Sequence, residues 1–358
     1  MLVSHSANFG DYSFMSHSPK DDKAIGFEAV KQARLAPNPG NFIKDISDML
    51  EFFGNHARPI GVDMGDDALT LVQMAGDKDA VRLLAADSIE YPSDIKPGST
   101  SWQRWVIKAT AQSVAHGQFR GKKAIAALPS GDLFIDTIQM PKAPEDELQN
   151  AIFNHLKPKL RIAPEDVLME HVKADSENIL VMATDKTKLY RHLAIYEKAH
   201  LKVAAISVWP MAVLRAYTHL WTRQMGQDDN PVMLLDIRKS CTNIVICDNM
   251  NLYFAHSAPV GAKDLDIDRM VDLLDSEMDM CRVRFSSTYN RPKVNQIIFV
   301  SGHAVDKDLY TKIAKRAQMA AQIGDCLEAV GAARPAQTNS EDHTRHANWI
   351  TAMGLSLS

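Results

Sequence analysis

Ile60-Gly-Val-Asp-Met-Gly65 shows the pattern that decides the fold, and two later stretches, 234–243 and 297–303, repeat it. Each stretch begins with consecutive apolar residues and ends in polar or glycine-containing turn residues. Short apolar runs that are bounded by turn signals are typical of buried strands in an α/β protein. The three stretches therefore predict three buried strands, each ending in a tight polar turn.

The size and composition of the chain restrict its class. It has 358 residues, of which 46% are hydrophobic and 23% are charged, so it is long enough for two lobes with separate cores. The formal net charge is -4, and the lysines and arginines are spread along the sequence. Nucleic-acid binding depends on concentrated positive charge, so we expect no nucleic-acid partner.

The sequence offers no segment that we expect to enter a membrane. It lacks a run of ~18 uncharged apolar residues, and no apolar core follows a basic start at its beginning. Its four cysteines form no CxxC pair, which is typical of reduced thiols in a cytoplasmic protein. We therefore expect a cytoplasmic protein that reaches a membrane only through a partner.

The first 57 residues differ from the rest of the chain. Ser, His, Asn, Pro and Gly are frequent up to position 40 and no hydrophobic period persists there, which predicts a largely flexible extension. Apolar residues then recur at spacings of three and four within 42–53, which predicts a short helix with one apolar face. Two interpretations remain open, because such a helix can pack on the body of the protein or bind a partner.

The remaining sequence divides into two lobes and an insert. Alternating strand and helix patterns predict a first α/β lobe from 58–129 and 201–225. The block between them, 130–200, predicts a small α+β subdomain, and 230–358 predicts the second lobe. The expected strands are 60–63, 68–74, 80–91, 123–128, 133–139, 167–172, 179–183, 232–236, 242–247 and 252–257. The expected helices are 105–115, 144–156 and 187–199, with a further helix that starts at 209–214 and one with a solvated acidic face over 264–279.

Both lobes open with the same unit. In 60–74 and again in 232–247, an apolar strand ends in Asp and is followed by a polar turn and a second strand. A duplicated unit of this kind, one in each lobe, resembles the actin-like ATPase superfamily. Further motifs, in the same order along the chain, resemble the type IV pilus assembly protein PilM family over residues 58–356. These motifs are Gly121-Lys-Lys-Ala-Ile-Ala-Ala-Leu-Pro129, Thr137-Ile-Gln-Met-Pro141, Pro144-Glu-Asp-Glu-Leu-Gln-Asn-Ala-Ile152, Ser257-Ala-Pro-Val-Gly-Ala262 and Ala352-Met-Gly-Leu-Ser356.

The resemblance implies a two-lobed actin-like ATPase fold, similar to that of the division protein FtsA, with a small subdomain inserted in the first lobe. It implies a cytoplasmic scaffold of a type IV pilus or related secretion-type inner-membrane assembly. PilM-like proteins bind the cytoplasmic tail of a PilN-like membrane protein in a groove between the first lobe and the insert. Here Leu133, Ile135, Ile152 and Phe153 would line that groove, although apolar residues in this pattern also fit an ordinary core.

The resemblance also implies ATP, with magnesium, between the lobes. The implied cofactor-binding residues are Asp63, Gly65, Asp236, Thr242, Asn243 and Gly302. Asp63 and Asp236 would orient the magnesium ion and its waters, and the other residues would offer backbone N–H groups or polar side chains. The two aspartates have a second interpretation, since Asp commonly caps its own turn.

Several residues depart from that pattern. Asp66 and Asp67 replace small residues, and at ~4 Å even a screened like-charge pair with phosphate costs on the order of 1–4 kcal/mol. Arg238 and Lys239 stand where small residues are expected, which hinders close approach of the backbone to phosphate. His303 would fill the place of adenine or stack on it. We therefore expect a degenerate site without ATP hydrolysis, and the alternative is an ATP-binding switch with slow ATPase activity.

The second lobe is expected to be shortened, because the stretch from Gly261 to a helix near 278–286 is short for the family. Self-association is possible, but such a shortening disfavours filaments like those of actin relatives. Other catalytic sites are not indicated. The sequence has no GxSxG or HExxH motif, and His343 and His346 lack a third metal ligand.

Overall fold

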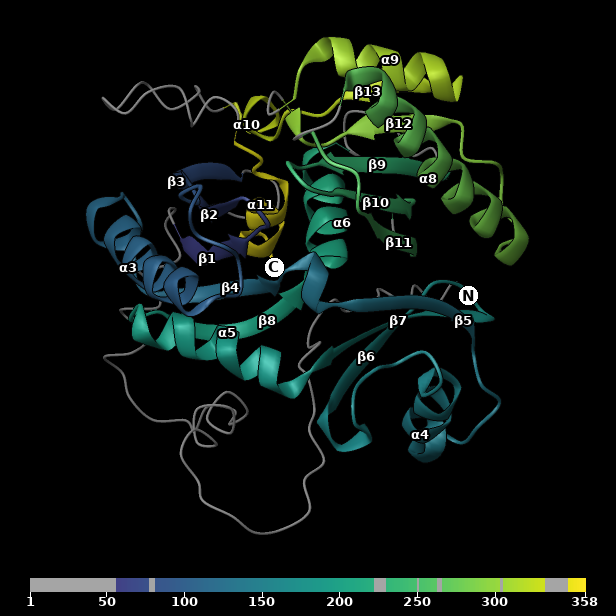
Figure 1. Cartoon of the computed structure of the whole chain (residues 1–358), viewed down its shortest axis with the longest axis horizontal. Coiled ribbons are helices and arrows are strands. Elements are labelled where there is room, and N and C mark those ends of the chain that lie inside the picture. The colour runs from purple at the N-terminus through teal and green to yellow at the C-terminus, as the bar shows by residue number, and fades with distance from the viewer. Residues whose placement is uncertain are drawn as a thin grey trace, which may run out of the picture.

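The computed structural model describes residues 56–76, 81–221, 230–249, 251–262, 266–302, 305–331 and 347–358. Two α/β lobes stand side by side, and a smaller sheet lies below the second lobe and beside the first in the view of Figure 1. The predicted helix at 42–53 and nearly all of the predicted extension at 1–57 lie outside the described residues.

Each lobe is built on a five-stranded sheet, ordered β3-β2-β1-β4-β8 in the first lobe and β11-β10-β9-β12-β13 in the second. The first-lobe strands are β1 (Ala57–Met64), β2 (Ala68–Ala75), β3 (Arg82–Glu90), β4 (Lys123–Leu128) and β8 (Lys202–Val208). The second-lobe strands are β9 (Val232–Ile237), β10 (Thr242–Cys247), β11 (Leu252–Ala258), β12 (Gln296–Phe299) and β13 (Ala320–Ile323). In both sheets three strands form an antiparallel meander, and the other two run parallel to its first strand. The predicted duplication is therefore confirmed.

Five of the described α-helices begin at a capping side chain. Those that follow a polar N-cap are α3 (Thr100–His116), α5 (Lys186–Lys198), α8 (Ile267–Thr288), α9 (Lys307–Ala317) and α10 (Cys326–Ala329). Their caps are Ser99, Asp185, Asp266, Asp306 and Asp325, and each accepts a hydrogen bond from a backbone N–H of the first turn. These bonds satisfy donors that a helix start would otherwise leave unpaired.

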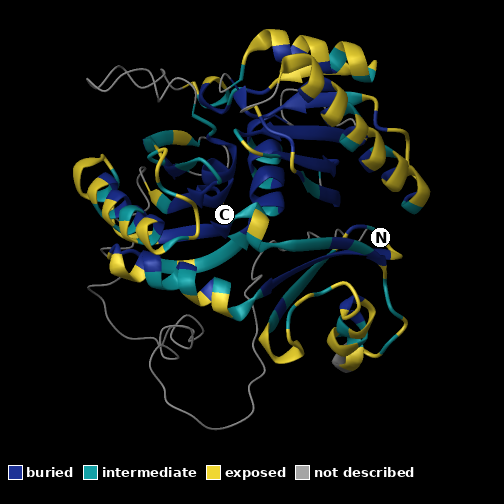
Figure 2. Cartoon of the chain, viewed as in Figure 1, coloured by how far each residue is buried: buried dark blue, intermediate teal, exposed yellow. Residues whose placement is uncertain are grey.

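The two lobes exchange helices. α6 (Trp209–Leu220) follows the last strand of the first lobe, but its apolar residues pack in one core with Leu234 and Val245 of the second-lobe sheet. α11 (Ile350–Ser356) follows the second lobe, but it packs on β1, where all seven of its residues are buried. Figure 2 shows α6 mostly in the colour of buried residues, between the two sheets. The first lobe therefore depends on a helix from the far end of the chain, whereas the second lobe packs on the helix that precedes it in the sequence.

The insert has its own sheet, ordered β5-β7-β6. Its elements are β5 (Phe134–Gln139), α4 (Glu145–Leu156), β6 (Val167–Lys173) and β7 (Asn178–Asp185), with short 3-10 turns at Ser130–Asp132 and Pro164–Asp166. α5, which the sequence pattern groups with the insert, also packs on the first lobe, since Ile195 and Tyr196 join its core beside Trp102. Asp132 fixes the start of α5, because it lies 3.0 Å from Nε2 of His192 and 2.8 Å from Nζ of Lys188.

The insert also contacts the second lobe. Arg284 of α8 forms an ion pair with Asp136 of β5, and its guanidinium lies 5.6 Å from the ring centre of Phe254 in β11. Ala174, in the turn between β6 and β7, is buried in the core of the second lobe. The insert therefore bridges both lobes.

Several elements differ from the sequence prediction. α8 spans Ile267–Thr288, so it joins the helix that the acidic run 264–279 predicts to the one expected near 278–286. β8 and β13 were not predicted as strands, nor were α9, α10 and α11 predicted as helices. The strand expected at 123–128 coincides with β4.

Replacing Gly61 by Ala should destabilise the protein strongly. A Cβ at this position would lie 1.9 Å from the carbonyl oxygen of Ala352, so α11 would have to move away from β1. We expect a loss of about 3 kcal/mol in the free energy of unfolding, measured by urea denaturation. Gly131→Ala is the matched control, because no atom lies within 4 Å of its added Cβ. Equal stability of the two variants would contradict the close packing of α11.

Candidate functional site between the lobes

Arg238, directly after β9, closes the cleft between the lobes. Its Nη2 donates to Oδ2 of Asp63 in β1 at 2.9 Å, and its Nε donates to Oδ2 of Asp236 in β9, also at 2.9 Å. The same Nη2 donates to Oγ1 of Thr351 in α11 at 2.9 Å. One guanidinium therefore joins both lobes and the exchanged helix α11.

Asp236 receives two further donors. Asn243 lies opposite it in the β9–β10 ladder and donates from Nδ2 to Oδ2 at 3.1 Å. Asn348, just before α11, donates from Nδ2 to the other carboxylate oxygen. Both Asp236 and Asn243 are buried, and Arg238 is only 9% exposed. The local sequence explains this geometry, because positions 236 and 238 are two apart on an extended backbone and point to the same side.

The buried cluster holds two carboxylates against one guanidinium. Burial alone would lower the pKa of Arg238, but Asp236 and Asp63 raise it well above its ordinary value. Burial raises the pKa of Asp63; Arg238 opposes this rise, while Asp236 and Asp66 add to it. Asp236 also accepts hydrogen bonds from two side-chain amides, so its negative charge is better compensated than that of Asp63.

The polar turns that follow β1 and β9 also touch each other. The backbone N–H of Ser240 donates to Oδ2 of Asp66 at 3.0 Å, and its hydroxyl donates to the same oxygen. Nζ of Lys239 lies 2.8 Å from Oε2 of Glu90. Burial and the neighbouring carboxylate of Asp66 raise the pKa of Asp67 to about 6. The cleft is therefore bridged by polar contacts at its rim as well as in its interior.

The other predicted cofactor residues have structural contacts. A Cβ added to Gly65 would lie 2.5 Å from Nη1 of Arg238, so the guanidinium occupies the space beside this turn. Oγ1 of Thr242 donates to the carbonyl of Val260 at 2.7 Å. Gly302 has a φ of 61°, and its carbonyl accepts from the hydroxyl of Tyr310 at 2.9 Å. His303 lies outside the described residues.

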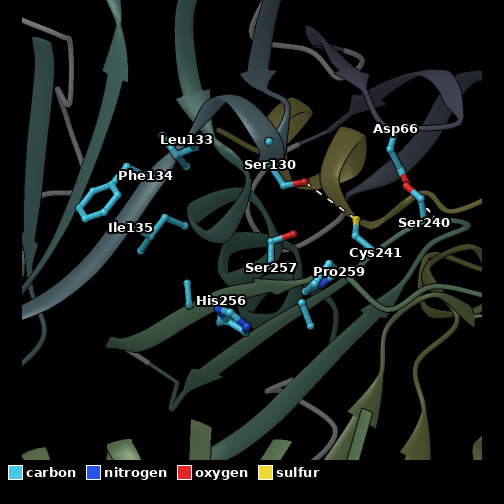
Figure 3. A pocket seen from close by; sticks show the side chains of 13 residues that line it. Asp66, Ser130, Leu133, Phe134, Ile135, Ser240, Cys241, His256, Ser257 and Pro259 are labelled. Carbon is cyan, nitrogen blue, oxygen red and sulfur yellow. Dashed lines mark hydrogen bonds between the residues drawn. The ribbon is translucent and has the colours of Figure 1, made fainter. Parts of the chain in front are cut away.

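A pocket of about 510 Å³ opens where the first lobe, the insert and the second lobe meet (Figure 3). Leu133 and Ile135 lie on its insert side, and Ser257 lies on the side of β11. Oγ of Ser130 lies 3.9 Å from Sγ of Cys241 across the boundary between the lobes. The pocket is separate from the buried Arg238 cluster, but Asp66 and Ser240 belong to its lining.

The four residues predicted to bind a partner do not line one groove. Leu133 and Ile135 line the pocket. Ile152 is fully buried in the core of the insert with Ile179, on the other side of the β5-β7-β6 sheet. Phe153 is half-buried and is not part of the pocket lining. The helical pattern of 144–156 predicts an inward-facing Ile152, but this side chain faces the β5-β7-β6 sheet and does not line the pocket.

Comparisons with known proteins identify the family. The model described as "Type IV pilus assembly protein PilM" matches residues 61–281. The chain belongs to the type IV pilus assembly protein PilM family. A chain of the "PilM-PilN type IV pilus biogenesis complex" superimposes with a TM-score of 0.68 and 19% sequence identity, covering 84% of this chain and 98% of that one. The ethanolamine utilization protein EutJ from Carboxydothermus hydrogenoformans has a TM-score of 0.48 and 13% identity, covering 84% and 89%. A search of curated proteins gave no match.

The membership confirms the predicted resemblance to PilM and the two-lobed actin-like fold. In the part of the chain that the structure describes, no three His, Cys, Asp or Glu side chains are placed to hold a metal ion. No helix within the described ranges is both long and apolar enough to cross a membrane. The role of Arg238 was missed by sequence reasoning, which treated it only as an obstacle to phosphate. The sequence feature that could have indicated this role is the Asp-x-Arg spacing at the end of a strand, together with a second Asp expected at the corresponding position of the other lobe.

Replacing Arg238 by Ala should destabilise this PilM-family protein, because it leaves Asp63 and Asp236 buried without their cation. We expect a loss of about 3–5 kcal/mol in the free energy of unfolding by urea denaturation. The control is Lys239→Ala, which removes a half-exposed ion pair with Glu90 and should cost less than about 1 kcal/mol. Similar losses for the two variants would rule out a structural role for the buried cluster.

The raised pKa of Asp67 predicts a pH dependence of stability. Its value of about 6 in the folded protein exceeds the ordinary 3.8, so the folded state holds this proton more tightly. Protonated Asp67 therefore adds to the free energy of unfolding below about pH 4, and this contribution is lost as the pH rises through 6. In urea denaturation, the wild type should lose stability over this range relative to Asp67→Asn. Asn substitution of the exposed Asp94 is the control and should leave the wild-type dependence intact, whereas parallel curves for wild type and Asp67→Asn would contradict the assignment.

Proposed function

We propose that this protein is a docking platform of a type IV pilus or related secretion-type assembly, which binds the cytoplasmic peptide of a PilN-like inner-membrane protein. The observation that carries the proposal is the pocket at the junction of the three sheets, because two free strand edges border it. The family match supports the assembly, and the similar PilM-PilN complex supports the choice of partner.

The strand edges suit an extended peptide. β5 is an edge strand of the insert sheet and β11 is an edge strand of the second-lobe sheet, and among the described residues neither has a ladder partner on its outer side. Residues 133–135 and 255–259 line the pocket from these two edges. A peptide that adds a strand to such an edge gains affinity from main-chain hydrogen bonds and selectivity from side-chain pockets.

The pocket walls differ in polarity, which sets the chemistry of the peptide. Leu133 and Ile135 offer apolar contacts on the insert side, and Ser240 and Ser257 offer hydroxyl groups opposite. Oδ1 of Asp66 is buried and has no hydrogen-bond partner within the described residues. The expected peptide is therefore extended, with apolar side chains toward β5 and a hydrogen-bond donor toward Asp66.

The residues between the lobes do not fit magnesium and ATP. Asp63 and Asp236, which would orient the metal, already share the guanidinium of Arg238, and this group also fills the space beside Gly65. We infer a degenerate site in which an internal cation holds the lobes together. The alternative, an ATP-binding switch with slow ATPase activity, requires Arg238 to leave two buried carboxylates, which costs several kcal/mol unless the nucleotide offsets it.

The same proposal places the protein in the cytoplasm, where the PilN-like partner holds it at the inner membrane. Its test is calorimetric titration of the full chain with a synthetic peptide that copies the partner's cytoplasmic segment, with and without magnesium ATP. We expect saturable binding that nucleotide does not change. Ile135→Arg and Ser257→Trp should each weaken binding by about tenfold or more, because they fill the pocket from opposite sides.

Val283→Arg is the matched control, since this residue is 69% exposed on α8 and does not line the pocket. Circular dichroism would verify that the variants fold. Wild-type affinity in both pocket variants would refute the peptide site, and a peptide affinity that changes with nucleotide would favour the switch.

A further inference from the structure

The fold gathers basic side chains that are far apart in the sequence. Lys123 begins β4 and Lys202 begins β8, and these two residues are register neighbours in parallel strands. The backbone N–H of Lys202 donates to the carbonyl of Lys122 at 2.7 Å. Lys198 ends α5, four residues before β8 begins, and Arg120 lies three residues before β4. We call Arg120, Lys122, Lys123, Lys198 and Lys202 the basic end of the first lobe.

These charges are available to a partner. All five side chains are exposed, and none forms an ion pair with a described residue. Lys123 and Lys202 point to the same side of the sheet, because register neighbours in a parallel pair do so. Like charges on neighbouring strands repel each other, and an external anion would relieve this repulsion. The positive surface also contrasts with the formal net charge of -4 of the whole chain.

The composition of the basic end indicates the kind of anion. Four of its five residues are lysines, whose compact charge suits a diffuse anionic surface better than bidentate recognition of one group. The pocket described above contains none of the five. We propose that the basic end contacts the anionic phospholipid headgroups of the membrane that holds the PilN-like partner. The presence of a membrane near the protein rests on the proposed function, whereas the cluster of basic side chains is a feature of the fold.

The proposal orients the molecule. Lys123 begins β4, and Ser130, which lines the pocket, follows shortly after β4 ends at Leu128. At about 3.3 Å per residue, a strand of this length separates the two sites by roughly 20 Å. With the basic end on the membrane, the partner's peptide must extend along the first lobe to reach the pocket. Each lysine near an anionic membrane surface adds to the attraction, so the four lysines together make contact significant but reversible.

Sedimentation of the full chain with vesicles tests the proposal. Vesicles of phosphatidylglycerol and phosphatidylcholine should bind the protein at low salt, and binding should fall as salt screens the charges. Vesicles of phosphatidylcholine alone should not bind it. The variant K122E/K123E/K198E/K202E should lose at least tenfold in affinity for the anionic vesicles, and a variant with glutamine at these positions should lose part of it.

The control variant is K157E/K293E/K307E/K315E, which changes the net charge equally at exposed lysines elsewhere. Its vesicle binding should stay within about twofold of wild type. Equal losses in both quadruple variants, no binding by the wild type, or tighter binding of the wild type to short duplex DNA than to vesicles would overturn the proposal. The assay contains no peptide, so its failure is separate from failure of the docking function. The basic-end variant should keep its affinity for the partner peptide.

Discussion

The ion pairs of Arg238 hold the structure in one arrangement of its lobes. Asp63 and Asp236 share the guanidinium of Arg238. A cation that belongs to the chain therefore supplies the positive charge that a bound metal would otherwise place between two carboxylates. Because the group is part of the chain, its local concentration is fixed and its binding needs no ligand from solution. Breaking it would expose two carboxylates in a poorly solvated site, so the closed arrangement is the low-energy state.

The other contacts across the lobes reinforce the same arrangement. Arg284 pairs with Asp136, which ties the insert to the second lobe, and Ser240 bonds Asp66 at the rim of the cleft. The pocket therefore lies between parts that are fixed relative to one another. A binding site built in this way is largely formed before its peptide arrives, and a preformed site loses less entropy on binding.

Much of the fold could be predicted from the sequence because its buried strands carry a strong local pattern. The strand at Lys123–Leu128 and the duplicated units after Ile60 and Val232 are continuous apolar runs between turn residues. β13 gave no such signal, since its four residues are all exposed, and α11 is a short helix with a glycine that depends on packing. For the site, Asp63, Gly65, Asp236 and Asn243 were predicted to lie together, and the structure places them around Arg238. Their common partner was not foreseen, because long-range side-chain pairing leaves no periodic pattern.

The exchanged helix α11 affects how the chain can fold during its synthesis. β1 is made early, but its surface at Gly61 is covered by Ala352 and Ser356 of α11, which leave the ribosome much later. The first lobe therefore lacks the helix that covers β1 for most of the time of translation, and it must avoid covering this strand with other segments. Completion of the C-terminal helix is then a late step that closes both lobes together, so we expect the nascent chain to need protection until that step.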